Sequence, residues 1–285
     1  MSTHRETIHL EDATVLQHDA LPDDQFVLRL HAPEMAKKAR PGMFTHIQCD
    51  PSVPMRRPLS IMRSDPSGWI ELLYKPLGPG LRLLSQRRSG DSISTLGPIG
   101  NSFDFTDYEN VIAIGGGVGI PPMIFVAQLL RSTVNLTVFM GSEIEFPIEL
   151  TPATIQTPGV DSTSKKASKL LTGWGVASHL ASNANFAGVH PGYVTELAAK
   201  QLDTYGESQR SRSLIVACGP EPMLAACAAL ARKYDVACQL ALEEFMACGV
   251  GGCAGCTVLV KTAQGNAMKR VCVDGPVFAA EQIYT

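Results

Sequence analysis

Four cysteines near the C-terminus have a spacing that suits metal chemistry. Cys248, Cys253, Cys256 and Cys272 follow the pattern C-x4-C-x2-C-x15-C. This is the spacing of plant-type [2Fe–2S] sites, in which four thiolates hold the two irons. Glycine and alanine dominate the positions between the first three cysteines, and such residues allow φ > 0 and let backbone amides turn toward sulfur. The four cysteines are therefore predicted to ligate a [2Fe–2S] cluster, which is a one-electron centre.

Two other interpretations of these cysteines compete with the cluster. A zinc site usually has two C-x2-C pairs, and this chain has one such pair. Four unrelated buried thiols are the second alternative, and the regular spacing argues against it. The remaining cysteines are scattered, and their simplest role is as small packing residues: Cys49, Cys218, Cys227 and Cys238.

Length and composition restrict the class of protein. A chain of 285 residues can form two domains with separate cores. Its content of 45% hydrophobic and 18% charged residues is ordinary for a soluble globular protein, and the net charge of −3 argues against nucleic acid or an anionic membrane as the main partner. No apolar run approaches the roughly 20 residues that span a bilayer, and the polar N-terminus lacks a signal-peptide core. We expect a cytoplasmic protein.

The first hundred residues read as antiparallel strands separated by clusters of Gly, Pro, Asp and Ser. Alternating apolar residues predict four strands, at 25–33, 42–50, 68–75 and 90–97. One short helix with a basic face is expected at 81–89. This pattern is typical of an antiparallel barrel or sandwich.

After residue 103 the pattern changes to strands that alternate with helices. A continuous apolar strand is expected at 111–116, two further strands at 135–141 and 213–220, and helices at 123–132 and 221–234. Such alternation predicts an α/β domain with a parallel sheet that binds a nucleotide. The stretch 151–190 has little periodicity and is expected to be an insertion or a mobile connection.

A third region begins with a strand at 236–244 and contains the cysteine loop and a hairpin with a turn at 263–266. It is too small to fold alone, so the cluster is expected to help hold it together. The predicted domain boundaries are 1–105, 106–235 and 236–285.

Three turns in the first region could hold a phosphate or a flavin. R-P-L-S at 57–60 offers an arginine fork to a pyrophosphate and a serine hydroxyl to a ring edge. Y-K-P-L-G-P-G-L at 74–81 places two glycines where a short helix begins, and G-P-I-G-N follows at 97–101. Each motif alone also fits a plain surface turn.

Two further glycine-rich motifs lie where strands meet helices in the α/β region. G-G-G-V-G-I-P-P at 115–122 departs from the usual G-x-G-x-x-G register, but its glycines still allow a pyrophosphate to approach the backbone. C-G-P-E-P-M occupies 218–223. The carboxyl ends of neighbouring parallel strands line the ligand crevice of such sheets. Cys218 could approach a nicotinamide there or could simply pack.

The order of these five motifs resembles the ferredoxin–NADP reductase superfamily. With the C-terminal block E-E-F-M-A-C-G-V-G-G-C-A-G-C and V-C-V-D-G-P-V-F, the chain is similar to one branch of it. That branch is the electron-transfer subunit of the two-protein, NAD-dependent dihydroorotate dehydrogenase. The resemblance covers nearly the whole chain and is weakest at 151–190.

The resemblance implies an α+β multi-domain fold with an FAD-binding antiparallel β-barrel, a parallel-sheet domain for NAD and a small [2Fe–2S] region. No residue of the chain need act as a catalytic acid or base. The residues implied to contact FAD are Arg57, Pro58, Leu59, Ser60, Tyr74, Lys75, Gly78, Gly80, Leu81, Gly97 and Gly100. Those implied to border the nicotinamide nucleotide are Gly115, Gly116, Gly117, Gly119, Cys218, Gly219 and Pro220.

The resemblance also implies a partner and a reaction. An FMN-containing catalytic subunit would oxidise dihydroorotate to orotate in pyrimidine biosynthesis, and electrons would reach NAD⁺ through the cluster and FAD in a heterotetramer. One alternative is a related NAD(P)H–ferredoxin or sulfhydrogenase-type reductase subunit that serves another partner. A second alternative is a non-catalytic redox sensor.

Two positions depart from the family pattern. Leu81 stands where the family usually has threonine after the G-x-G, so a hydroxyl contact to the FAD phosphate is absent. The family's acidic stretch near the nucleotide ribose has no clear counterpart in 151–190. The expectation of NADH over NADPH therefore depends on the resemblance alone.

Overall fold

The computed structural model describes residues 7–160 and 163–284. The chain divides into two compact units. We call the first the barrel unit, which contains the residues up to Phe103 together with Leu242–Val277. The second, the sheet unit, contains Asp104–Ala241 and the residues from Phe278 onward. The cysteine segment therefore belongs to the same compact unit as the barrel.

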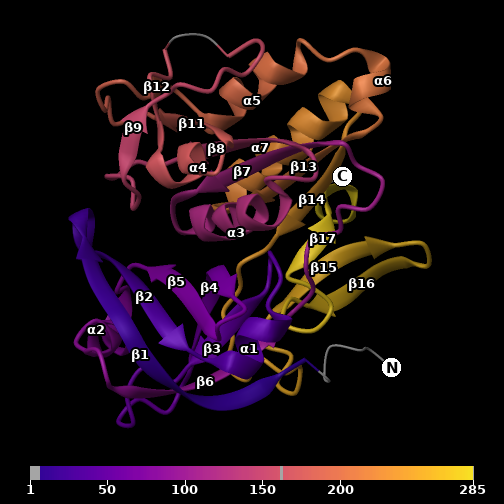
Figure 1. Ribbon diagram of the computed structural model, residues 1–285. Coiled ribbons are helices and arrows are strands. Elements are labelled where there is room, and N and C mark those ends of the chain that lie inside the picture. The colour runs from indigo at the N-terminus through magenta and orange to yellow at the C-terminus, as the bar shows by residue number, and fades with distance from the viewer. Residues whose placement is uncertain (1–6, 161–162, 285) are drawn as a thin grey trace. The chain divides into compact units, whose positions relative to one another are not determined.

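The barrel unit is built on a closed antiparallel barrel, as the alternating strands predict, with strand order β1-β2-β5-β4-β3-β6 (Figure 1). Its strands are β1 (His9–Leu21), β2 (Gln25–His31), β3 (Phe44–Ile47), β4 (Arg57–Asp65), β5 (Trp69–Tyr74) and β6 (Ser92–Ile99). A one-turn 3-10 helix at Pro22–Asp24 joins β1 to β2, and the helix α1 (Pro33–Lys38) follows β2. Every side chain of β3 is buried, so β3 forms part of the barrel core.

The helix α2 (Gly78–Leu84) begins and ends earlier than the predicted range of 81–89. Leu77 is extended, and Pro79 lies in the first turn, where its missing N–H leaves no intrahelical bond unmade. Beyond the helix, Arg87 continues as a turn in which its backbone N–H donates to the Leu84 carbonyl at 3.0 Å. The leucine spacing located the helix, whereas the proline and the glycines set its start.

The cysteine segment is attached to the barrel through the turn at 97–101. The Asn101 backbone N–H donates to the Gly275 carbonyl at 2.7 Å, and its side-chain amide donates to the Asp274 carbonyl at 2.8 Å. A Cβ on Gly100 would lie 2.3 Å from Pro276 Cδ. The hairpin of β15 (Thr257–Thr262) and β16 (Gly265–Arg270) completes this segment. The G-P-I-G-N motif thus holds the chain next to the last cysteine.

Replacing Gly100 with alanine is expected to destabilise the barrel unit by about 1–3 kcal/mol, because the new methyl group overlaps Pro276. Gly90→Ala is a matched control, since Gly90 has φ +92°, close to the +90° of Gly100, and nothing lies within 4 Å of its Cβ position. The free energy of unfolding in urea is measured for both variants. Gly90→Ala reports the backbone strain alone, and any additional loss in Gly100→Ala reports the clash with Pro276. Equal losses of unfolding free energy would contradict the packing role of Gly100.

The sheet unit contains a sheet with strand order β12-β11-β8-β7-β13-β14-β17. The strands β11, β8, β7, β13 and β14 run parallel, and the helices α3 and α5 with α7 lie on opposite sides of the sheet in Figure 1. The strands are β7 (Asn110–Gly116), β8 (Asn135–Gly141), β11 (Ala177–Ser182), β12 (His190–Pro191), β13 (Ser213–Cys218), β14 (Ala237–Ala241) and β17 (Val277–Ala279). The helices are α3 (Ile120–Leu130), preceded by a one-turn 3-10 helix at Gly117–Gly119, α4 (Lys169–Gly173), α5 (Val194–Leu202), α6 (Glu207–Arg210), α7 (Glu221–Tyr234) and α8 (Ala280–Ile283).

The expectation of an insertion or mobile connection at 151–190 is wrong. β9 (Leu150–Pro152) and β10 (Lys166–Ser168) form a small antiparallel pair, and β11 joins the main sheet beside β8. All six residues of β11, A-S-H-L-A-S, are buried. The small and polar residues of β11 give no apolar pattern in the sequence. The segment is a strand because it pairs with β8. Among the described helices, none has the length and apolarity needed to cross a membrane.

Candidate functional site

The arginine of R-P-L-S meets the glycines of the following motif within the barrel unit. Arg57 begins β4, opposite Ile47 of β3. A Cβ on Gly80 would lie 3.5–3.6 Å from the Arg57 guanidinium, which is ordinary van der Waals distance, so the two residues are neighbours. Arg57 Nη1 donates to the carbonyls of Met55 and Arg56 at 2.9 and 3.1 Å, which orients the guanidinium fork. A planar donor fork beside bare glycine backbone is a cradle that suits a pyrophosphate.

Other residues expected around FAD have a packing role in this structure. The Tyr74 side chain is buried, its hydroxyl lies 2.9 Å from His18 Nε2, and its ring stacks on Phe26 with centroids 5.6 Å apart. Burial raises the pKa of Tyr74. A Cβ on Gly97 would lie 3.2 Å from the Met35 methyl carbon, and Gly100 abuts Pro276. Leu59 is buried, and half-buried side chains are found at Pro58, Ser60, Lys75 and Leu81.

The two glycine motifs of the sheet unit pack directly on each other at the carboxyl ends of β7 and β13. Gly115 pairs in register with Cys218. A Cβ on Gly119 would lie 2.1 Å from the Cys218 carbonyl oxygen, and one on Gly116 would lie 2.6 Å from Met223 Sδ. The structure therefore brings together Gly115–Gly119 and Cys218–Pro220, as the motif order predicts. Their bare backbone at the strand ends is where a dinucleotide can approach an open α/β sheet.

Cys218 had two interpretations. Its side chain is only 2% exposed, and it lies within the all-buried strand β13. This burial supports the packing interpretation over a thiol that faces a nicotinamide. Gly117, by contrast, has φ +53° with nothing within 4 Å of its Cβ position, so it lies at the open part of the motif.

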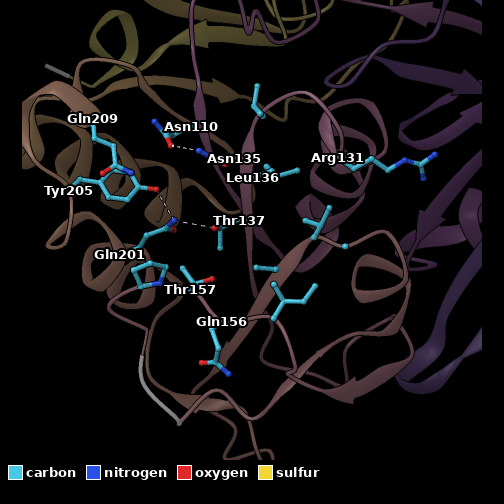
Figure 2. A pocket seen from close by; sticks show the side chains of 16 residues that line it. Asn110, Arg131, Asn135, Leu136, Thr137, Gln156, Thr157, Gln201, Tyr205 and Gln209 are labelled. Atoms are coloured by element: carbon cyan, nitrogen blue, oxygen red, sulfur yellow. Dashed lines mark hydrogen bonds between the residues drawn. The ribbon is translucent and has the colours of Figure 1, made fainter.

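A cavity of about 400 Å³ lies at the opposite edge of the same sheet, where Asn110, Asn135 and Ala177 begin their strands. Figure 2 shows that its polar side chains bond to one another. Gln201 Nε2 donates to the hydroxyls of Thr137 and Tyr205 at 3.1 and 2.8 Å, and Asn135 Nδ2 donates to Asn110 Oδ1 at 3.2 Å. This cavity is therefore separate from the nucleotide motifs, which lie at the carboxyl ends of the strands.

The cysteine loop has the backbone that a cluster requires. Gly249, Gly251 and Ala254 adopt left-handed conformations, with φ of +67°, +80° and +54°. These turns point amides at sulfur: Cys253 N–H donates to Cys248 Sγ and Gly255 N–H donates to Cys253 Sγ, each at 3.4 Å. Such amide–sulfur contacts hold a ligand loop and tune a cluster.

The four predicted cluster ligands make two contacts with one another. Cys256 Sγ and Cys272 Sγ are 3.3 Å apart, and the Cys253 amide contacts Cys248 sulfur. Within 7–160 and 163–284, no three His, Cys, Asp or Glu side chains surround a point that a single metal ion could occupy.

The thiol electrostatics differ between Cys248 and Cys272. Burial acts to raise the pKa of Cys248, but the backbone amides of Val250 and Cys253 outweigh it and lower the pKa to about 7. Burial and the neighbouring Cys256 raise the pKa of Cys272 to about 12. A cation bound between Cys256 and Cys272 would remove this penalty, because metal ligation deprotonates a thiol.

The sequence did not single out two further features of this region. His46 on β3 lies against the cysteine loop, since a Cβ on Gly249 would lie 2.8 Å from its Nδ1. Nothing in the sequence around His46 indicated this contact. Large apolar side chains are also exposed here, and Phe245 is 93% exposed, Leu259 59% and Met268 60%. Such residues look like core positions in the sequence and are found at the surface only through the fold.

Comparisons with known proteins point to one family. The family model for the iron-sulfur cluster binding domain of dihydroorotate dehydrogenase B matches residues 243–284, which include all four predicted ligands. The electron transfer subunit of dihydroorotate dehydrogenase B (NAD(+)) from Caldanaerobacter subterraneus subsp. tengcongensis is 33% identical over 251 residues, 87% of this chain and 88% of that protein. The protein of the same name from Geobacillus sp. (strain WCH70) is 32% identical over 282 residues, 96% of this chain and 98% of that protein.

Solved structures agree with these relatives. A chain from the structure of an NADH-dependent reduced ferredoxin-NADP oxidoreductase, studied for flavin-based electron bifurcation, is 26% identical with a TM-score of 0.76, over 96% of this chain and 90% of that chain. A ferredoxin NADP+ reductase from Neisseria gonorrhoeae shares the fold at 14% identity, with a TM-score of 0.59 over 79% of this chain and 91% of that chain. With the cysteine loop, the Arg57–Gly80 cradle and the facing glycine motifs, these matches show that the chain belongs to the family of electron-transfer subunits of dihydroorotate dehydrogenase B.

Proposed function

We propose that this chain carries electrons between an FMN-containing catalytic subunit, which oxidises dihydroorotate to orotate, and NAD⁺. The path uses a [2Fe–2S] cluster and FAD held by this chain. The observation that carries the proposal is the cysteine loop in the same unit as the Arg57–Gly80 cradle. A protein with both sites can exchange electrons with two chemically different partners.

The four cysteines would hold the cluster through their thiolates. The sulfur atoms of Cys256 and Cys272 are already in contact, and the Cys253 amide bonds the Cys248 sulfur. Arg270 supports the loop from outside, because its Nη1 donates to the Gly251 carbonyl at 3.1 Å while its backbone N–H donates to the Asp274 carboxylate at 2.8 Å. These contacts fix the last ligand relative to the first three.

Arg57 and the backbone at Gly78 and Gly80 would hold the FAD pyrophosphate, and Gly115–Gly119 would let the NAD pyrophosphate approach β7. A bound flavin supplies the conversion between two-electron hydride chemistry with nicotinamide and one-electron chemistry with the cluster. The residues of this chain bind and orient these groups, and no acid or base side chain is required.

The exposed apolar residues beside the cysteine loop would form the docking surface for the catalytic subunit. We define this surface by Phe245, Val250, Leu259 and Met268, which are 93%, 40%, 59% and 60% exposed. Leu259 and Met268 are directly paired across the hairpin, so they share one face of it. The cluster ligand Cys253 is also exposed, and electrons would therefore leave through this surface.

Replacing Phe245 with serine is expected to weaken binding of the catalytic subunit by about 2 kcal/mol or more, roughly thirtyfold in Kd, because a large exposed aromatic is a typical interface anchor. Surface plasmon resonance with the purified subunit measures the change. Leu10→Ser is the control, since Leu10 is 66% exposed on β1. Unchanged affinity of the Phe245 variant would contradict this docking surface.

The function is tested by mixing this chain with the catalytic subunit and measuring dihydroorotate-dependent NAD⁺ reduction. The chain alone is expected to be inactive toward dihydroorotate, and the mixture active. Purified anaerobically, the chain should contain FAD and two irons, and should show a rhombic EPR signal on reduction. Stoichiometric zinc, or an inactive mixture, would refute the proposal. Light scattering of the mixture tests the expected heterotetramer, and cell fractionation tests a cytoplasmic location.

The bifurcating ferredoxin-NADP oxidoreductase structure favours one second candidate, a reductase subunit of the same build with a different partner. Affinity capture of this chain from its own cells separates the two candidates. Recovery of a pyrimidine dehydrogenase supports the first, and recovery of a ferredoxin-linked flavoprotein supports the second.

A further inference from the structure

His46 is a fully buried histidine in the barrel, with 0% of its surface exposed. An imidazole ring always carries at least one N–H donor. Neither nitrogen reaches a described partner at full hydrogen-bond geometry. A buried polar group without a partner costs free energy, and its presence calls for an explanation.

The ring of His46 faces the start of the cysteine loop. A Cβ on Gly249 would lie only 2.8 Å from His46 Nδ1, so glycine is required there for steric reasons as well as for its φ of +67°. The backbone carbonyls of Met246 and Cys248 also face the ring. His46 therefore lies directly beneath the residue that follows the first cluster ligand.

The backbone of His46 belongs to the wall that would hold FAD. Its register partner on β4 is Pro58, and the adjacent Ile47 pairs with Arg57. The His46 carbonyl accepts a hydrogen bond from Arg56 Nη1 at 3.3 Å, and the same guanidinium group donates to the Ser94 carbonyl at 2.8 Å. One residue thus contacts the flavin-binding strand through its backbone and the cluster loop through its ring.

We propose that His46 is a positioning residue for the [2Fe–2S] cluster: its ring packs against Gly249, its N–H faces the carbonyls of the Met246–Cys248 stretch, and these contacts fix Cys248 relative to the strand that carries Arg57. The inference rests on the proposed function, since it concerns the same cluster. Outer partners of metal ligands orient the ligand and tune the metal, and their loss costs about 10–100-fold in affinity or activity. Hydrogen bonding around the sulfurs also sets the reduction potential.

The test compares His46→Leu, which keeps side-chain bulk without a donor, with His46→Asn, whose amide nitrogen replaces Nδ1. His31→Leu, at the exposed end of β2, is the control. In the full chain, we expect the Leu variant to lose its cluster to a chelator at least about tenfold faster than wild type. Its cluster potential and EPR g-values should shift, while FAD content and the flavin potential remain unchanged. The Asn variant should restore the wild-type values in large part.

Wild-type cluster lifetime, potential and g-values in His46→Leu would overturn the inference, as would an Asn variant no better than Leu. If the Leu variant does not fold, Gly249→Ala perturbs the same contact from the loop side and should shift the cluster signal in the same assays. No shift there would also overturn it. A wild-type chain with flavin but no iron would instead refute the proposed function itself, so the two failures are distinguishable.

Discussion

Replacing Cys272 with alanine is expected to abolish dihydroorotate-dependent NAD⁺ reduction by the complex. Cys272 comes from the distant end of the cysteine segment and contacts Cys256, so its loss would remove one of the four thiolates that would hold the cluster. Because loss of an outer partner alone already costs about 10–100-fold, loss of the ligand itself should cost at least about 100-fold. The iron content and the EPR signal measure the loss of the cluster directly.

The same variant should keep its flavin chemistry. Oxidation of NADH with ferricyanide needs FAD and the nucleotide motifs but not the cluster, so this rate should persist in Cys272→Ala. Cys227→Ala is the control, since Cys227 is a fully buried thiol of α7 in the sheet unit, whereas the four predicted ligands belong to the barrel unit. A Cys272 variant that retains two irons and full coupling would show that Cys272 is not a ligand.

Replacing Arg57 with alanine is expected to weaken FAD binding by about 1.5–3 kcal/mol, the usual contribution of a hydrogen bond to a charged group. That corresponds to roughly a ten- to hundredfold rise in Kd for FAD. The reason is the guanidinium fork beside Gly80, which has the geometry to bind a pyrophosphate. Flavin fluorescence during titration of the apoprotein measures the affinity.

Arg57→Lys should restore only part of this affinity, since an ammonium group is a point charge and lacks the planar fork. Arg82→Ala is the matched control, because Arg82 is an exposed arginine on α2, the helix that contains Gly80. The Arg82→Ala variant should bind FAD with wild-type affinity. If Arg57→Ala binds FAD as tightly as Arg82→Ala does, the cradle is not the flavin site. Iron content should be unchanged in both variants.

The sequence determined the local chemistry of this protein. The C-x4-C-x2-C-x15-C spacing indicated the cluster ligands, because left-handed turns and sulfur-facing amides need small residues at fixed offsets. Alternating apolar residues predicted the antiparallel barrel, and the buried apolar runs at 111–116 and 135–141 predicted parallel strands, since each pattern reflects how many faces of a strand are covered.

Only the tertiary structure decided which distant residues meet. β11 is a strand because β8 pairs with it, although its own small residues show no apolar pattern. Gly100 leaves room for Pro276, which belongs to a segment far along the chain. His46 lies against Gly249 for the same reason. The spacing of residues in the sequence indicates which neighbouring side chains can act together. Contacts between distant segments form only when the barrel closes and the cysteine segment packs on it.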